Sequence, residues 1–347
     1  MESGLTQGPV LRRARVLAVS ADRAVVELLE GPLAGRIVPA VFYRQLGDLP
    51  TVGEELAANT VGLEMGLGSG GVAVVLPSAA GDSVPANANH FVKLPYTPLQ
   101  FPAPPPPQAE DLIGVPVVVL PLHSHLAPAC CEAAFLRPGC RVAFVWQEGG
   151  ALPVSLSDTV RALKEKDLLH SVISAGSCFG GDVEAPNAYA GLLAAAAVEE
   201  GVGLVLAGIG PGVVGTAGAY GHGGMAAAVA LNAAVALGAV PVLAPRLSAA
   251  DLRERHRGVS HHTRSALRAA LGGCRVAFPA RCDVPAEGLA ESFPDRHACE
   301  RVGASAAGLE RRFGVTFESM GRRYDDDAVF FDAAVAAVAL ALGERPS

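Results

Sequence analysis

Histidine side chains gather in a few polar segments of this sequence, and they are the residues best suited to chemistry. The segment HSHLAP contains His123, and RHRGVSHHT contains the adjacent pair His261 and His262. A fourth candidate, Asp182, lies in the polar segment GSCFGGDVEAPN. Imidazoles and a carboxylate can transfer protons near neutral pH, so these four residues are the candidate catalytic groups.

The same side chains could hold a divalent metal ion such as zinc. His123, Asp182 and His261 would be its ligands if their loops meet. Of two adjacent histidines at a helix start, at most one is expected to bind the ion directly, because neighbouring side chains point in different directions. Alternatively, Ser260 caps a helix over 261–271, and the histidines bind an anion or donate protons at its N-terminus. A divalent metal therefore stays open as a cofactor.

Glycines in the segment GIGPGVVGTAGAYGHGG could bind an anionic group through backbone amides. Gly210, Gly212 and Gly215 match the GxGxxG pattern of dinucleotide sites, but the following helix is delayed, and Arg246 stands where that pattern requires an acidic residue. The sequence therefore argues against a dinucleotide and favours capture of a phosphate or carboxylate. The candidate anion-binding residues are Gly210, Gly212, Gly215, Thr216, Arg246, His256, Arg257 and Ser260.

The chain has seven cysteines, and they show no CxxC pair or other metal-knuckle spacing. Free thiols are the expected state. Cys178 stands in GSCFG, a form that can present a nucleophile on a tight turn if a base lies nearby. A small residue in a glycine-rich turn is the favoured interpretation, because the pattern is common in a chain with 40 glycines.

The polar segments follow apolar runs that predict the strands of a parallel sheet. These runs occupy residues 115–122, 141–147, 171–176, 204–208, 241–245 and 275–279. They are continuous rather than alternating, which indicates a sheet covered on both faces by the intervening helices, such as 187–200 and 224–238. We predict a Rossmann-like, doubly wound parallel sheet over residues 111–347, with ligands bound at the carboxyl ends of its strands. Segments 304–313 and 325–343 would be extra C-terminal helices at its edge.

Residues 1–100 have a different pattern, with short β-branched runs broken by turn residues. The pattern predicts a small antiparallel β-barrel or curled sheet. The stretch KLPYTPLQFPAPPPPQAE is too rich in proline for a helix or a central strand. We therefore predict an extended connector that ends near residue 110.

Charge and hydropathy exclude several classes of protein. The net charge of −7 argues against a protein that coats duplex DNA, although a local RNA site stays open. No apolar run reaches the roughly 18 to 20 residues that span a bilayer, and the N-terminus lacks a secretory signal, so we expect a cytoplasmic protein. The expected partner is a small anionic molecule, and the sequence permits a homo-oligomer.

Several long strings in the sequence carry a resemblance to a known family. They are LPLHSHLAP, GSCFGGDVEAPNAYAGLLAA, GIGPGVVGTAG, ALNAAVALGAVPVLAPRLS, RHRGVSHHT and SMGRRYDDDAVFF. Over nearly its whole length the chain resembles the bacterial family known as domain of unknown function 3866. The resemblance implies a shared architecture and no particular activity. The residues that match its pattern are His123, Asp182, His256, Arg257, Ser260, His261 and His262. In that family the loop after the third predicted strand, which here contains Cys178, does not depend on a cysteine.

Three functions are compatible with these features. The first is an enzyme that acts on a small anionic metabolite at the strand ends, with His123, His261 and Asp182 as acid–base groups or metal ligands. The second is a ligand-sensing or scaffold protein whose β-domain binds a partner or RNA. The third, a dehydrogenase using the glycine-rich segment, requires dinucleotide binding.

Overall fold

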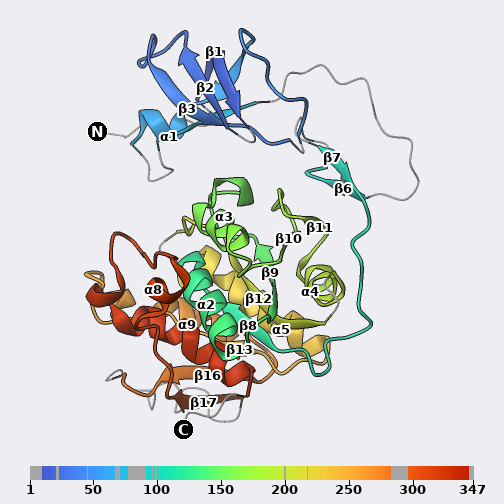
Figure 1. Cartoon of the computed structure of the whole chain (residues 1–347), viewed down its shortest axis with the longest axis vertical. Coiled ribbons are helices and arrows are strands. Elements are labelled where there is room, and N and C mark those ends of the chain that lie inside the picture. Colours follow the sequence, from blue (N-terminus) through green and yellow to red (C-terminus); the bar gives the residue numbers. More distant parts are fainter. Residues whose placement is uncertain are drawn as a thin grey trace. The chain divides into compact units, whose positions relative to one another are not determined.

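The computed structural model of the chain divides into two compact units, Met1–Ala103 and Pro104–Ser347. Each unit has a hydrophobic core of its own. Their elements can be followed by colour and label in Figure 1. The structure describes residues 10–20, 23–44, 46–66, 71–76, 91–95, 97, 100–198, 201–216, 218–282 and 296–343.

The first unit contains a closed five-stranded barrel, which confirms the predicted small β-barrel. Its elements are β1 (Leu11–Ser20), β2 (Arg23–Leu28), β3 (Ile37–Val41), β4 (Glu55–Asn59), α1 (Val61–Glu64) and β5 (Ala73–Val75). The order around the barrel is β1-β2-β3-β5-β4, and only the β3–β5 pair is parallel. Side chains alternate along each strand, so Ala14, Val16 and Val26 are buried inside while Arg13 and Arg15 face outward.

The proline-rich stretch contains a short ribbon that the sequence did not predict. Strand β6 (Phe91–Lys93) pairs antiparallel with β7 (Phe101–Ala103), and Val92 stands opposite Pro102. Proline is tolerated there because each strand of a two-stranded ribbon has one edge without ladder bonds. Residues 104–116 contain no helix or strand, as expected of a connector.

The second unit is built on eight parallel strands in the order β11-β10-β9-β12-β8-β13-β16-β17. Their bounds are β8 (Val117–Leu120), β9 (Arg141–Gln147), β10 (Ser171–Ala175), β11 (Val183–Ala185), β12 (Val202–Ile209), β13 (Val242–Leu243), β16 (Cys274–Pro279) and β17 (His297–Val302). All six predicted strands are present. The two additional strands, β11 and β17, form the edges of the sheet and are short or partly polar, so they lack the continuous apolar run of a central strand.

Helices cover both faces of this sheet, as a doubly wound fold requires (Figure 1). One face carries α2 (Leu126–Leu136), α3 (Asp158–Glu165), α8 (Leu309–Phe313) and α9 (Ala328–Ala341); the other carries α4 (Ala188–Ala197), α5 (Ala226–Ala236) and α6 (His261–Ala269). Helix α9 was expected at the edge of the sheet. It instead packs across β8, β13 and β16 and against α2, because almost all of its side chains are apolar and need burial.

The carboxyl ends of the parallel strands share one edge of the sheet, where the polar loops meet. The loop after β12 leads through η3 (Gly223–Met225) into α5, and β13 continues into a hairpin, β14 (Leu247–Ser248) and β15 (Gly258–Val259). This hairpin encloses η4 (Glu254–His256) and leads directly to α6. Among the described helices, none has the length and apolar character needed to cross a membrane.

Candidate functional site

A cavity of about 480 Å³ lies at the carboxyl ends of β9 and β10. Its polar lining residues are Gln147, Glu148, Asn187 and His222, and its apolar wall includes Ala175, Pro186, Met225 and Val229. Helix α4 begins at this cavity with Asn187 as its cap, whose Oδ1 accepts a hydrogen bond from the backbone of Ala190 (3.0 Å). Apolar walls with a few polar groups are typical of small-molecule sites.

Glu148 is fixed against the turn that follows β10. Its Oε1 accepts hydrogen bonds from the backbone amide (2.7 Å) and the hydroxyl (2.8 Å) of Ser177. A Cβ at Gly176 would lie 2.4 Å from the same oxygen, so only glycine permits this approach, and its φ of +67° also favours glycine. The carboxylate is therefore held in one position on the cavity wall.

Four histidines form a cluster next to the cavity, and His222 belongs to both. The ring of His222 stacks on that of His262 at 3.9 Å, and His261 lies 4.4 Å from His262 and 5.1 Å from His222 between ring centroids. His256 completes the cluster at 4.9 Å from His261. The cluster joins the loop after β12, the hairpin after β13 and the start of α6.

Burial keeps these imidazoles neutral. Desolvation, reinforced by the positive charge of Arg246, lowers the pKa of His256 to about 3. Desolvation and the neighbouring His222 lower the pKa of His262 to about 2, and desolvation also lowers the pKa values of His222 and His261. At neutral pH the cluster therefore offers nitrogen lone pairs rather than positive charges.

Hydrogen bonds identify which ring nitrogens carry those lone pairs. Nε2 of His222 donates to the carbonyl of Ala219 (3.0 Å), so Nδ1 is the unprotonated nitrogen. That Nδ1 and Nε2 of His261 are both buried and have no hydrogen-bond partner among the described residues. Nδ1 of His262 accepts from Nη1 of Arg246 (3.2 Å). Two buried nitrogens are thus left for a ligand.

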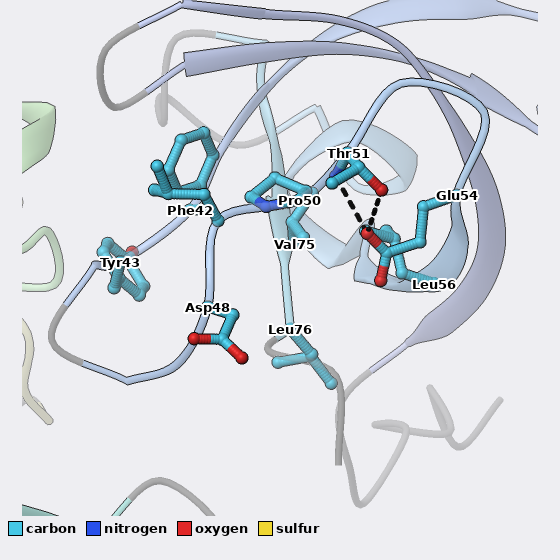
Figure 2. A pocket seen from close by; sticks show the side chains of 10 residues that line it. Phe42, Tyr43, Asp48, Pro50, Thr51, Glu54, Leu56, Val75 and Leu76 are labelled. Atoms are coloured by element: carbon cyan, nitrogen blue, oxygen red, sulfur yellow. Dashed lines mark hydrogen bonds between the residues drawn. The ribbon is translucent and has the colours of Figure 1, made fainter. Parts of the chain in front are cut away.

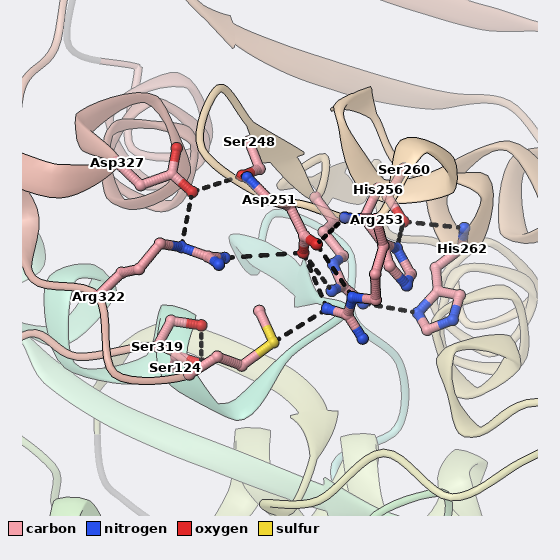
Figure 3. Close-up of polar contacts among 12 residues, drawn as sticks. Ser124, Ser248, Asp251, Arg253, His256, Ser260, His262, Ser319, Arg322 and Asp327 are labelled. Atoms are coloured by element: carbon pink, nitrogen blue, oxygen red, sulfur yellow. Dashed lines mark hydrogen bonds and ion pairs between the residues drawn. The ribbon is translucent and has the colours of Figure 1, made fainter.

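A network of arginines and aspartates lies next to the histidine cluster and contacts it through Arg246 and His262 (Figure 3). Asp251 is buried and contacts three arginines: Arg253 at 2.8 Å, Arg246 at 3.5 Å and Arg322 at 3.7 Å. The hydrogen bonds from Arg253 hold the pKa of Asp251 well below its usual range. Arg322 also pairs with Asp327 (3.3 Å), which accepts a hydrogen bond from Ser248. Asp251 therefore offsets only part of the positive charge that these three arginines place beside the cluster.

Part of the set predicted from the sequence is assembled by this arrangement. His256, Ser260, His261, His262 and Arg246 are all brought together. Ser260 caps α6, as predicted, by accepting a hydrogen bond from the backbone of His262 (3.2 Å), and its hydroxyl also contacts Nδ1 of His256 (2.8 Å). Arg257, which belongs to the same hairpin, is exposed.

His123 and Asp182 lie apart from this cluster. His123 is packed against Trp146 (5.0 Å between centroids), its Nε2 contacts the Ser157 hydroxyl (2.8 Å), and desolvation lowers its pKa to about 4. Asp182 pairs with Lys164 and accepts from the amide of Val172 (2.7 Å), near the amino end of β10. The loop after β10 folds back along the sheet before β11 begins, and this reversal carries Asp182 to the edge opposite the cluster.

The predicted anion-binding glycines pack against another loop instead of lining the cavity. A Cβ on Gly210 would lie 2.3 Å from the Trp146 ring, and Gly212 accepts a hydrogen bond from the amide of Ala151 (2.7 Å). Gly215 bridges to His222, and Thr216 bonds Gly221 in the same loop. These residues shape the loop that positions His222. Cys178 is half-buried against the hydrophobic cluster shared with α2 and α9.

Four residues of this edge were not among the predicted site residues: Glu148, Asn187, His222 and Asp251. All four stand in polar segments that follow predicted strands, so their position was a usable signal. What the sequence could not give was the fold-back of the loop after β10, which removes Asp182 from the edge and leaves Glu148 and Asn187 there.

The barrel has a smaller cavity of about 270 Å³ (Figure 2). One carboxylate oxygen of its lining residue Glu54 accepts hydrogen bonds from both the amide (2.9 Å) and the hydroxyl (3.1 Å) of Thr51. Burial raises the pKa of Tyr43, another lining residue, to about 12, so its phenol stays protonated. Unlike the cavity beside the histidine cluster, this cavity has no histidine among its described lining residues.

Comparison with known proteins places most of the chain in one protein family. A model of the family described as protein of unknown function (DUF3866) matches residues 39–338. Neither the curated proteins nor the solved structures gave a match. The matched range runs from β3 of the barrel into α9, and it confirms the resemblance carried by the sequence strings. The chain therefore belongs to the DUF3866 family.

Proposed function

We propose that this protein is a cytoplasmic enzyme that acts on a small anionic metabolite, which binds in the cavity at the carboxyl ends of β9 and β10. One observation carries the proposal: His222 lines the cavity and also belongs to the histidine cluster, and its buried Nδ1 has no partner among the described residues. An unprotonated imidazole beside a cavity is a group that reacts with a bound molecule.

The cavity offers different groups to the two ends of such a molecule. The first amides of α4 point out of the helix at Asn187, and the partial positive charge there favours an anionic group. Glu148 lies on the wall as a hydrogen-bond acceptor. These contacts favour a metabolite with a phosphate or carboxylate at one end and a hydroxyl or amine at the other.

A thermal-shift screen of phosphate- and carboxylate-bearing metabolites, with their uncharged analogues, tests this proposal. His222→Gln keeps a donor for the Ala219 carbonyl but removes Nδ1, and we expect it to weaken binding of any hit by at least about 10-fold. His170→Asn is the matched control, because His170 lies before β10, where its Nδ1 accepts from Val142 (3.0 Å) and its Nε2 lies 3.6 Å from Asp167. Equal binding of charged and uncharged analogues, or full binding by His222→Gln, would contradict the proposal.

The alternative function is a ligand sensor whose barrel binds RNA or another partner. The barrel favours it, since the order β1-β2-β3-β5-β4 with β3 parallel to β5 is that of OB-fold barrels, many of which bind oligonucleotides. Against RNA, the outward arginines are paired: Arg13 with Glu30 (3.3 Å) and Arg15 with Glu55 (2.8 Å). Binding of single-stranded RNA without turnover of any metabolite would support this alternative over the enzyme.

A further inference from the structure

We propose that His222, His261 and His262 bind one transition-metal ion of the Zn²⁺ class at the edge of the cavity. This inference rests on the proposed function in one respect only, namely that an anionic metabolite in the cavity would contact the ion. Metal binding itself is measured without any metabolite.

The three imidazoles are close enough to share an ion, including the adjacent His261 and His262, of which at most one was expected to bind; their ring centroids lie only 4.4 Å apart. One nitrogen from each lies within 4.8 Å of the nitrogens of the other two. Ligand nitrogens in a tetrahedral zinc site are roughly 3.3 Å apart, as follows from bonds of about 2.0 Å. The rings of His222 and His262 stack nearly parallel (16°), so binding requires them to rotate out of this arrangement until their in-plane lone pairs converge on the ion.

Two of these residues have a buried ring nitrogen without a partner among the described residues, and in His222 that nitrogen already presents the lone pair that a metal requires. The Ala219 carbonyl accepts from Nε2 of His222 and thereby fixes the tautomer with a free Nδ1, which is how metal-binding histidines are commonly oriented. Nε2 of His261 is buried and also has no partner within the described part of the chain. A buried ring nitrogen without a partner is unfavourable, and an ion would satisfy both nitrogens once the proton of His261 is on its Nδ1.

His262 is the conditional third ligand. In the absence of an ion its Nδ1 accepts from Arg246, which leaves the proton on Nε2. Metal binding must therefore break this contact, after which Arg246 keeps its pairing with Asp251 (3.5 Å). The ion and Arg246 would then present two positive charges beside the cavity, where an anionic metabolite could serve as the fourth ligand.

The surrounding charge restricts which metal can bind. All three ligands are imidazole nitrogens, and Arg246 and Arg255 add positive charge nearby. Mg²⁺ and Ca²⁺ depend on oxygen ligands, so they should not bind here. Zn²⁺, Co²⁺ and Ni²⁺ bind imidazole strongly enough to tolerate the arginines.

The test is a titration of the full-length, chelator-treated protein with Co²⁺, followed by its visible absorption, and with Zn²⁺ by calorimetry. We expect one equivalent to bind with the intense absorption of tetrahedral Co²⁺, and an excess of Mg²⁺ should not displace it. Loss of an outer contact to a ligand typically weakens binding by about 10- to 100-fold. Loss of a ligand itself should cost at least as much, so His222→Gln and His261→Gln should each lower the affinity by at least about 10-fold.

His170→Asn should bind as the wild type does, which controls for loss of a histidine outside the cluster. Fluorescence of Trp146 verifies that each variant is folded, and His261→Gln changes only a half-buried residue at a helix start. The inference is overturned if Co²⁺ does not saturate at one equivalent, or if both cluster variants bind it as tightly as the wild type. A metal-binding protein that takes up no anionic metabolite would instead overturn the proposed function alone.

Discussion

At the scale of single residues, the cavity edge depends on a close crossing of two loops. Gly149, which follows β9, meets Gly223, which opens η3, and a Cβ on Gly223 would lie 1.9 Å from the carbonyl oxygen of Gly149. Both glycines line the cavity beside His222. The loops can approach this closely only because neither residue has a side chain.

Gly223→Ala should therefore destabilise the second unit and displace His222. Because the contact is with backbone, we expect a loss of about 1–3 kcal/mol, the usual range for overpacking. Urea unfolding followed by fluorescence measures it. Gly218→Ala is the control, since its nearest atom would be the Thr216 hydroxyl at 3.4 Å. Equal stability of the two variants would contradict the prediction, because it would mean that the two loops can move apart at little cost.

How far the sequence specifies the site also depends on single residues. Ser260 was correctly predicted as the cap of α6, because capping depends on residues adjacent in the chain. The separation of His123 from His261 depends on packing against Trp146, which no local pattern encodes. The tautomer of His222 depends on the Ala219 carbonyl, and loop conformation alone brings that group within reach.

At the scale of elements, the contact between α2 and α9 includes two carboxyl groups, the buried Glu132 and the half-buried Asp332. Desolvation, with the nearby charge of Asp332, raises the pKa of Glu132 to about 7, and burial also raises the pKa of Asp332. Asp332 is held by the amide of Ala306 (2.7 Å) and the hydroxyl of Ser305 (3.2 Å). Ionisation of Glu132 therefore opposes the packing of the two helices.

This arrangement predicts a pH dependence with a definite sign. The folded pKa of Glu132 exceeds its unfolded value near 4.5, so its stabilising effect is complete below pH 4.5 and is lost as the pH rises through about 7. Glu132→Gln should match the wild type at pH 4.5 and be more stable at pH 8, by on the order of 2–3 kcal/mol. Urea unfolding at several pH values checks this, with the exposed Glu165→Gln as control. A constant difference across the pH range would contradict it.

The strands and most helices were predictable because burial on both faces leaves continuous apolar runs such as VPVVVLPL. Edge strands are less apolar, and β17 (HACERV) carries charged residues for that reason. Helix α9 was recognised as a helix, but its uniform apolar character does not say which surface it covers. That position follows from the sheet and α2, which lie far away in the sequence.

At the scale of the whole molecule, two units with separate cores should unfold separately. Trp146 is the only tryptophan of the chain and is buried in the second unit. Its fluorescence therefore reports on that unit alone. Val26→Asp places a charge in the core of the barrel, where Val26 has no exposed surface.

We expect Val26→Asp to unfold the barrel and reduce the β-sheet signal in circular dichroism. The free energy of unfolding obtained from the Trp146 transition in urea should stay within about 0.5 kcal/mol of the wild-type value, as for an independent site. Val25→Asp is the matched control, because the neighbouring Val25 is 37% exposed. A shift of the Trp146 transition by Val26→Asp alone would instead mean that the two units are coupled.

The order of strands in the large sheet has a consequence for synthesis of the chain. Strand β8 is the first to be made, yet its partners are β12 and β13, and β12 begins about 80 residues after β8 ends. At about 5–20 residues per second, β8 leaves the ribosome roughly 4 to 16 seconds before β12 exists. During that interval neither neighbouring strand of β8 exists, although β9, β10 and β11 are already made. We therefore expect this apolar strand to stay unpaired on the nascent chain until β12 follows, which makes it a segment that chaperones would bind.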